Sequence, residues 1–293
     1  MKTQIFKDLI GCNEVIVDDV RIDEKQESLF IKVRPFKVWQ KRCPVCHRVC
    51  GSYDHGGGLR HWRCHDFGDR KAYVEALAPR IRCPEHGIKV SEVPWAAQNS
   101  RFTYAFEERV GWLSVYASRK TVSELMRIDW HTAGDICRRV FERVLQRATD
   151  TANASRDPQD KITNVLFDGL VNIGIDETSY KKGHKYLTVI VNHDTNSVIW
   201  AAPGHDEATL SKFFDELSES QRSSIRCVSG DGASWIASCV KKYCPNAERS
   251  MDPFHVVQWA TDELDALRRK IFSKKKQELE SQYTDVTAKK KKT

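Results

Sequence analysis

The sequence lacks the features of a membrane or secreted protein. Its 293 residues include no run of about 18 apolar residues, so no segment is suited to span a bilayer. No long apolar stretch follows residues 1–7, which argues against a secretion signal. No repeat with a period of about 20–50 residues is visible. At roughly 100–200 residues per domain, the length predicts two or three domains.

Charge of one sign does not dominate either. The chain is 40% hydrophobic and 30% charged, which suits a packed core and excludes a wholly disordered chain. Its net charge is +7 and its isoelectric point is about 8.8. This balance permits a polyanionic partner but does not require one.

Cysteine is plentiful, with ten residues, but a chain without a secretion signal gives no basis for a disulfide framework. The early cysteines are typical of metal binding: Cys12, Cys43, Cys46, Cys50, Cys64 and Cys83. We expect the later ones to be small buried hydrophobic residues: Cys137, Cys227, Cys239 and Cys244.

Two short motifs have the spacing of zinc knuckles. Each supplies two ligands separated by two residues: Cys43-Pro44-Val45-Cys46 and Cys83-Pro84-Glu85-His86. Zinc prefers four such ligands in a tetrahedron, so the pair predicts one closed, structural zinc site. Buried, reduced cysteines are the alternative interpretation, and the competing ligands are Cys50, Cys64 and His65.

The knuckles lie in a segment that we predict to be a small β-rich domain, residues 1–98. Short β-branched stretches at 15–22 and 29–33 predict strands, and Gly56-Gly57-Gly58 predicts a turn. Because the segment has little continuous apolar periodicity, we expect it to need a bound metal to fold.

Residues 99–150 change to helical periodicity, with three short apolar stretches joined by tight connections. This pattern predicts a helix-turn-helix whose third helix begins near His131 or Thr132 and enters the major groove of DNA. A plain three-helix bundle is the alternative. The basic side chains expected at DNA are Arg119, Lys120, Arg127, Arg138 and Arg139.

A polar linker is expected at 151–160, and an α/β domain at 161–272. Strands are expected at 171–176, 186–192, 197–202, 225–229 and 247–251, and helices at 206–218, 233–242 and 254–272. This order matches a ribonuclease-H-like mixed sheet, in which the first and fourth strands are neighbours.

Both of those strands end in a carboxylate, Asp176 and Asp231. Side by side, such carboxylates hold two divalent cations about 3.5–4 Å apart, and we expect Mg²⁺ or Mn²⁺. Glu177 could aid or replace Asp176, whereas Asp252 is expected to begin the last helix or to act as an accessory group rather than as a core ligand. An Asp at a strand end is otherwise a turn residue or a helix cap.

The end of the chain, residues 273–293, is predicted to be a basic tail. Clusters at 268–270, 274–276 and 289–292 contain only Lys and Arg. A solvated helix face with a disordered tail and contact with the DNA backbone are both compatible with this composition.

Taken together, these strings resemble the DDE-type insertion-sequence transposases of the ISL-three family over nearly the whole chain. The strings that carry the resemblance are RCPEHG at 82–87, VPWA at 93–96, SRFT at 100–103, GIDETSYKKGH at 174–184, VSGDGA at 228–233 and DPFHVV at 252–257.

The resemblance implies a bacterial cytoplasmic protein, associated with the nucleoid, that oligomerises on DNA. It would bind terminal inverted repeats and target DNA and catalyse strand cleavage and transfer with Asp176 and Asp231. Family members use a third carboxylate on a later helix, but 36 residues (293 − 257) follow Val257. We therefore expect the front part of a transposase; the alternative is an inactive DNA-binding remnant that competes with intact transposase.

Overall fold

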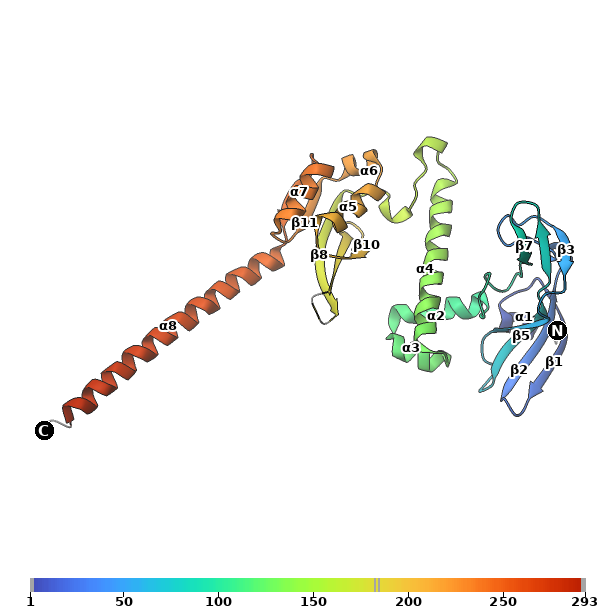
Figure 1. Ribbon diagram of the computed structural model, residues 1–293, viewed down its shortest axis with the longest axis horizontal. Coiled ribbons are helices and arrows are strands. Elements are labelled where there is room, and N and C mark those ends of the chain that lie inside the picture. Colours follow the sequence, from blue (N-terminus) through green and yellow to red (C-terminus); the bar gives the residue numbers. More distant parts are fainter. Residues whose placement is uncertain (1–2, 182, 184, 291–293) are drawn as a thin grey trace. The chain divides into compact units, whose positions relative to one another are not determined.

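The computed structural model describes residues 3–181, 183 and 185–290. The chain divides into two compact units, Met1–Arg147 and Ala148–Thr293 (Figure 1). Lys182 and His184 of the string at 174–184 lie outside the described residues, as do residues 291–293 of the basic end. Within the described part of the chain, no helix is long and apolar enough to cross a membrane.

The first unit is built on a four-stranded sheet in the order β1-β2-β5-β4. β2 is parallel to β5, and the other neighbours are antiparallel. One face of the sheet packs against α1 (Gln4–Ile10), with Ile31, Trp62 and Val74 in the core. The strands are β1 (Val15–Asp23), β2 (Ser28–Pro35), β4 (Leu59–Arg63) and β5 (Lys71–Leu77), so the strands expected at 15–22 and 29–33 are present.

A second, antiparallel sheet in this unit has the order β3-β6-β7. Its strands are β3 (Gly51–Asp54), β6 (Arg80–Cys83) and β7 (Gly87–Val90). Its core is very small, because Cys43, Ile81 and Cys83 are the buried members of its cluster. So few buried apolar side chains do not stabilise this small sheet by themselves. A bound metal would supply the additional cross-link.

Three helices complete the first unit, and they are the three that the periodicity predicted. They are α2 (Tyr104–Tyr116), α3 (Arg119–Met126) and α4 (Trp130–Asn153). Phe106, Val110, Val122 and Ile136 form their shared core. α4 continues into the segment expected as a linker and ends at Asn153, where the Asn153 side chain binds the backbone of Ile162.

The second unit contains a five-stranded mixed sheet in the order β10-β9-β8-β11-β12. β8 is antiparallel to β9 and parallel to β11, so the first and fourth strands are neighbours, as predicted. All five strands expected from the sequence are present: β8 (Asn172–Lys181), β9 (Lys185–Asn192), β10 (Ser197–Pro203), β11 (Cys227–Gly230) and β12 (Glu248–Met251).

Helices pack on this sheet around one hydrophobic core. Ile173 and Ile175 from β8 are buried together with Leu210 and Phe213 from α5 and Ile236 from α7. The helices are α5 (Glu207–Glu216), α6 (Glu219–Ser224), which the sequence did not predict, and α7 (Ser234–Tyr243).

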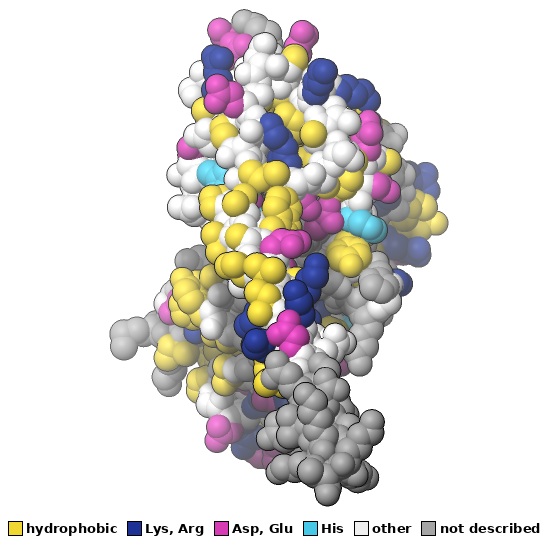
Figure 2. Space-filling model, turned by 90° about the vertical axis from the view of Figure 1, so that its left-hand side faces the viewer, with side chains coloured by type: hydrophobic (Ala, Val, Ile, Leu, Met, Phe, Trp, Pro, Cys, Tyr) yellow, Lys and Arg dark blue, Asp and Glu magenta, His cyan; other side chains and the backbone are white. Residues whose placement is uncertain are grey.

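The last helix, α8 (Pro253–Lys290), is longer than expected. The expectation that it ends at residue 272 and gives way to a tail is wrong, because residues 273–290 contain no Gly or Pro. Ion pairs one turn apart, such as Lys275–Glu278 at 3.1 Å, support the added turns. Figure 2 shows hydrophobic side chains exposed beside Lys and Arg, and α8 exposes Val257, Leu264 and Ile271.

Candidate functional site

The structure brings the four predicted zinc ligands together in one cluster. One ligand pair comes from the turn at 43–46 and the other from the hairpin between β6 and β7. Each turn is followed by a residue with positive φ, His47 at 57° and Gly87 at 68°. These left-handed residues turn the chain back, so that both ligands of a knuckle face the same point.

The distances within the cluster suit a tetrahedral metal. The Sγ atoms of Cys46 and Cys83 are 3.7 Å apart, and His86 Nδ1 lies 3.7 Å from Cys43 Sγ and 3.5 Å from Cys83 Sγ. Zn–S bonds of about 2.3 Å at the tetrahedral angle place two sulfurs about 3.8 Å apart, and a sulfur and a nitrogen slightly closer. The four side chains therefore fit a zinc ion without rearrangement.

Electrostatics also favour a cation here. Hydrogen bonding from the backbone N–H of Arg48 lowers the pKa of the Cys46 thiol to about 6, so a thiolate forms readily. Burial instead raises the pKa of Cys43, whose thiolate then needs a cation beside it.

The competing ligands are placed elsewhere. Cys64 is buried in the core of the four-stranded sheet, where burial raises its pKa to about 12. Cys50 packs against the cluster without joining it, and the His65 ring lies 6.3 Å from that of Phe106. Among the described residues, the Cys43–Cys46–Cys83–His86 set forms the one group of three or more side chains close enough to share a metal.

The second site is the turn between α3 and α4. Ser118 caps α3 through the N–H of Thr121, and Arg127 ends that helix in the left-handed conformation, with φ of 54°. Asp129 then accepts hydrogen bonds from the N–H groups of His131 and Thr132, which lower its pKa and fix the start of α4. This is a helix-turn-helix whose second helix begins at the predicted position.

Five of the predicted DNA contacts lie at or near the surface of this motif. Lys120, His131 and Arg138 are exposed, and Thr132 is half-buried in the first turn of α4. Arg119 is exposed as well, and its guanidinium lies 4.4 Å from the ring centroid of Trp130. All five belong to the first turn of α3 or to the first half of α4.

The structure places the remaining two, Arg127 and Arg139, in contacts within the protein. Arg127 pairs with Asp66 at 3.2 Å and donates to the backbone carbonyl of Asp69 at 2.7 Å. Arg139 donates to the fully buried carboxylate of Glu107 at 2.6 Å. The sequence could not reveal these roles, because both partners lie far away along the chain.

The third site lies in the middle of β8 and just past the end of β11. The prediction that the first strand ends at Asp176 is wrong, because β8 continues to pair with β9 as far as Lys181. In the register of these parallel strands Ile175 is opposite Gly230, so Asp176 and Asp231 follow at adjacent positions. Neighbouring strands lie about 4.8 Å apart. The Asp176 carboxylate accepts the N–H of Glu177 at 2.8 Å, and that of Asp231 accepts the N–H of Ala233 at 2.9 Å.

Glu177 belongs to the same electrostatic environment. Burial raises its pKa, and the negative charges of Asp231 and Asp176 raise it further. His205 and His255 act in the opposite direction and lower the pKa of Glu177. Their imidazole rings are therefore close enough to interact with this carboxylate. The sequence analysis did not single out these histidines. His255 stands in the DPFHVV string, which was a usable signal, whereas His205 has no pattern of its own.

The start of α8 closes one side of this site. As expected, Asp252 begins the helix, and it accepts the N–H of Phe254 at 2.9 Å. A Cβ atom on Gly232 would lie 2.8 Å from the ring of Trp259, so this close approach requires glycine next to Asp231. Arg249 on β12 donates to the carbonyl of Asp231, and its other terminal nitrogen is buried without a partner.

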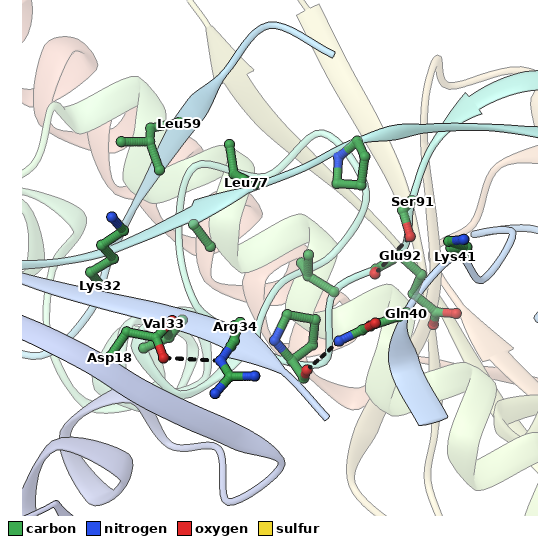
Figure 3. Close-up of a pocket in the computed structure, with 14 residues that line it drawn as sticks. Asp18, Lys32, Val33, Arg34, Gln40, Lys41, Leu59, Leu77, Ser91 and Glu92 are labelled. Atoms are coloured by element: carbon green, nitrogen blue, oxygen red, sulfur yellow. Dashed lines mark hydrogen bonds and ion pairs between the residues drawn. The ribbon is translucent and has the colours of Figure 1, made fainter. Parts of the chain in front are cut away.

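A pocket of about 320 Å³ lies in the first unit, away from all the predicted ligands (Figure 3). Leu59 and Leu77 line it on one side, and Ser91 and Glu92 on the other. Its rim carries an ion pair between Asp18 and Arg34 at 2.9 Å. No predicted catalytic, DNA-binding or zinc-binding side chain lines this pocket.

Comparison with protein families matches two of these sites, the helix-turn-helix and the paired carboxylates, to models of one family. Residues 91–140 match the model described as the helix-turn-helix domain of transposase family ISL3. Residues 173–292 match the DDE transposase model of the same family, described as "Transposase". The first match contains the turn between α3 and α4, and the second contains the ends of β8 and β11.

Curated relatives agree with these matches. The transposase for insertion sequence element IS1557 of Mycobacterium tuberculosis is 42% identical over 275 residues, which is 92% of this chain and 58% of the relative. The transposase for insertion sequence element IS1001 of Bordetella parapertussis is 24% identical over 228 residues, 77% of this chain and 52% of the relative. The chain thus spans a little over half the length of these relatives.

Proposed function

Since the chain belongs to the ISL3 family of insertion-sequence transposases, we propose that it recognises the terminal inverted repeats of its element and acts in DNA strand cleavage and transfer. The observation that carries the proposal is the strand register that sets Asp176 beside Asp231. The curated relatives are transposases of insertion sequences, and the DDE family cleaves and joins DNA strands.

In this proposal Asp176 and Asp231 hold Mg²⁺ or Mn²⁺ at the end of a ribonuclease-H-like sheet. Burial, and after it the charges of Asp231 and Asp176, raise the pKa of Glu177, and a cation beside these carboxylates would offset both effects. The bound cations would supply an activated oxygen nucleophile and charge neutralisation at the scissile phosphate. Arg249 keeps the backbone of Asp231 in place, and α8 closes the site beside Gly232.

We assign DNA recognition to the helix-turn-helix. His131 and Thr132 stand in the first turn of α4, where base edges are read, and Arg138 extends that surface. Arg119 and Lys120 at the start of α3 contact phosphates. We leave Arg127 and Arg139 out of this surface, because Arg127 binds both Asp66 and the carbonyl of Asp69, and Arg139 binds the fully buried carboxylate of Glu107.

We further propose that Cys43, Cys46, Cys83 and His86 bind a structural zinc ion. The chain then has a zinc-binding domain at 1–98, a helix-turn-helix at 99–150, a linker at 151–160, a transposase domain at 161–272 and a basic end at 273–293. Because an element has two ends, we propose that the protein works as a homo-oligomer on DNA, at the bacterial nucleoid.

A cleavage assay on duplex DNA tests the activity. The substrate carries the sequence that borders the reading frame, and Mg²⁺ is present or replaced by a chelator. Cleavage is expected for the wild type and is lost in Asp231→Asn. The matched control is Asp194→Asn, which removes a carboxylate at the opposite end of β8. Equal cleavage by both variants would exclude Asp231 from the reaction.

A further inference from the structure

The outer face of the β3-β6-β7 sheet carries side chains that neither the metal site nor the helix-turn-helix uses. Along β6, Ile81 and Cys83 are buried toward the metal cluster. Because side chains alternate along a strand, Arg80 and Arg82 point to the opposite face, which is exposed.

Both of these arginines lie close to the ring of Tyr53. The guanidinium carbons of Arg80 and Arg82 lie 5.2 and 5.3 Å from its ring centroid. A break in the β3–β6 register between Ser52 and Asp54 leaves Tyr53 out of the ladder, and such an irregularity redirects a side chain. Tyr53 is 42% exposed, so this face presents an aromatic ring with a phenol hydroxyl beside two planar cations.

The charges on this face are unequal. Arg80 donates two hydrogen bonds to the Asp54 carboxylate and is thereby neutralised and held in place. Arg82 forms no ion pair with a carboxylate among the described residues, and its one charge contact is with the Tyr53 ring. A guanidinium with free N–H groups, fixed against a ring, is prepared to bind an anion with two oxygens.

We propose that Arg82 and the Tyr53 hydroxyl bind a phosphate of the DNA backbone, so that the zinc-binding part of the chain adds a second contact to that of the helix-turn-helix. This inference rests on the proposed DNA-binding function. DNA is the occupant because the face offers hydrogen-bond donors and positive charge, and the exposed large hydrophobic residues described on it are Tyr53 itself and Ile88.

The first unit also has the rigidity that a two-part contact requires. Arg127 at the turn of the helix-turn-helix binds Asp66 and the carbonyl of Asp69. Backbone hydrogen bonds join Arg63 of β4 to Arg101 at 2.8 Å and to Thr103 at 2.9 Å. The helices are therefore fastened to the four-stranded sheet, which belongs to the same compact unit as Arg82 and Tyr53.

The test measures DNA affinity of the full chain by fluorescence anisotropy over a series of salt concentrations. The probes are a duplex with the element's terminal repeat and a scrambled duplex of equal composition. Arg82→Ala is expected to weaken binding to both duplexes alike and to reduce the slope of log affinity against log salt by about 1. A fourfold rise in salt then weakens the variant about fourfold less than the wild type. Tyr53→Phe is expected to weaken binding with an unchanged slope.

Lys89→Ala is the matched control, because Lys89 is an exposed cation on the neighbouring strand, paired with Ile81 and so on the other face. Equal zinc content and equal melting temperature in both variants confirm that the fold is retained. If Arg82→Ala binds like Lys89→Ala while Arg138→Ala binds weakly, the inference is overturned and the proposed function stands. If the wild type binds neither duplex, both are wrong.

Discussion

Arg138 and Arg139 are neighbours on α4, and the structure predicts opposite results when each is replaced by alanine. The Arg138 side chain is 69% exposed and pairs with Asp135 at 3.3 Å on the surface. Arg139 is half as exposed, at 33%, and pairs with Glu107, whose side chain is 0% exposed. We expect Arg138→Ala to weaken DNA binding at unchanged stability, and Arg139→Ala to lower stability.

The magnitude follows from the partners of Glu107. Its carboxylate accepts hydrogen bonds from Arg139 at 2.6 and 3.1 Å, from Arg143 at 2.5 Å and from the Ser100 hydroxyl at 2.9 Å. Breaking a buried ion pair costs about 3–5 kcal/mol in the free energy of unfolding. Arg143 and Ser100 remain, so we expect about 2–3 kcal/mol for Arg139→Ala, which lowers the melting temperature by about 5–10 °C. The exposed Arg138 pair contributes less than about 1 kcal/mol.

Urea denaturation followed by circular dichroism measures the free energy of unfolding. Fluorescence anisotropy with terminal-repeat DNA measures the DNA affinity. Binding is compared at a temperature at which all the variants are folded. An Arg139→Ala protein that melts with the wild type but loses DNA affinity would refute this division of roles. A strongly destabilised Arg138→Ala protein would also refute this division of roles.

Three further substitutions test the other sites. Cys83→Ser is expected to abolish bound zinc, measured as metal per purified chain, whereas Cys50→Ser retains it; equal zinc content would contradict the ligand set. The pKa of Glu177 is raised in the folded state from about 4.5, so the free energy of unfolding falls as the pH rises above that value. Glu177→Gln should remove this fall in melting curves recorded across the acidic range; an unchanged pH profile would argue against it. Arg249→Ala leaves the Asp231 carbonyl without its donor, so we expect the free energy of unfolding, measured by urea denaturation, to fall by about 1–2 kcal/mol. An unchanged free energy of unfolding would argue against this contact.

The sequence predicted best the features that depend on local chemistry. Two knuckles with fixed ligand spacing predicted the cluster of three cysteines and one histidine, because each turn brings its own pair of side chains to one point. The β-branched stretches predicted the strands of the mixed sheet, and the order of the elements predicted that β8 lies beside β11. Once these strands are neighbours, the adjacent positions of Asp176 and Asp231 follow from the register that sets Ile175 opposite Gly230, although β8 continues five residues beyond Asp176.

Roles that depend on distant partners were not predictable. Arg127 and Arg139 look like DNA contacts in a basic helix-turn-helix, and nothing in their local sequence distinguishes them from Arg138. Their ion pairs are with Asp66 and Glu107, which reach them through the tertiary fold, and whether either arginine also contacts DNA stays a prediction. The end of α8 was misjudged for a different reason: a lysine-rich composition was interpreted as disorder, although it contains no helix-breaking residue.

The separation of the hydrophobic cores in the first unit indicates how zinc affects DNA binding. The cluster around Cys43 has very few buried side chains, so without metal the β3-β6-β7 sheet has little to hold it. The helices have their own core around Phe106 and Val110, and Arg127 fastens them to the loop of Asp66 rather than to the knuckles. Zinc removal should therefore abolish the contribution of Arg82 while the helix-turn-helix stays folded. The salt dependence of metal-free wild type should then equal that of zinc-bound Arg82→Ala, which connects the metal site to DNA binding without any direct contact between the zinc and the DNA.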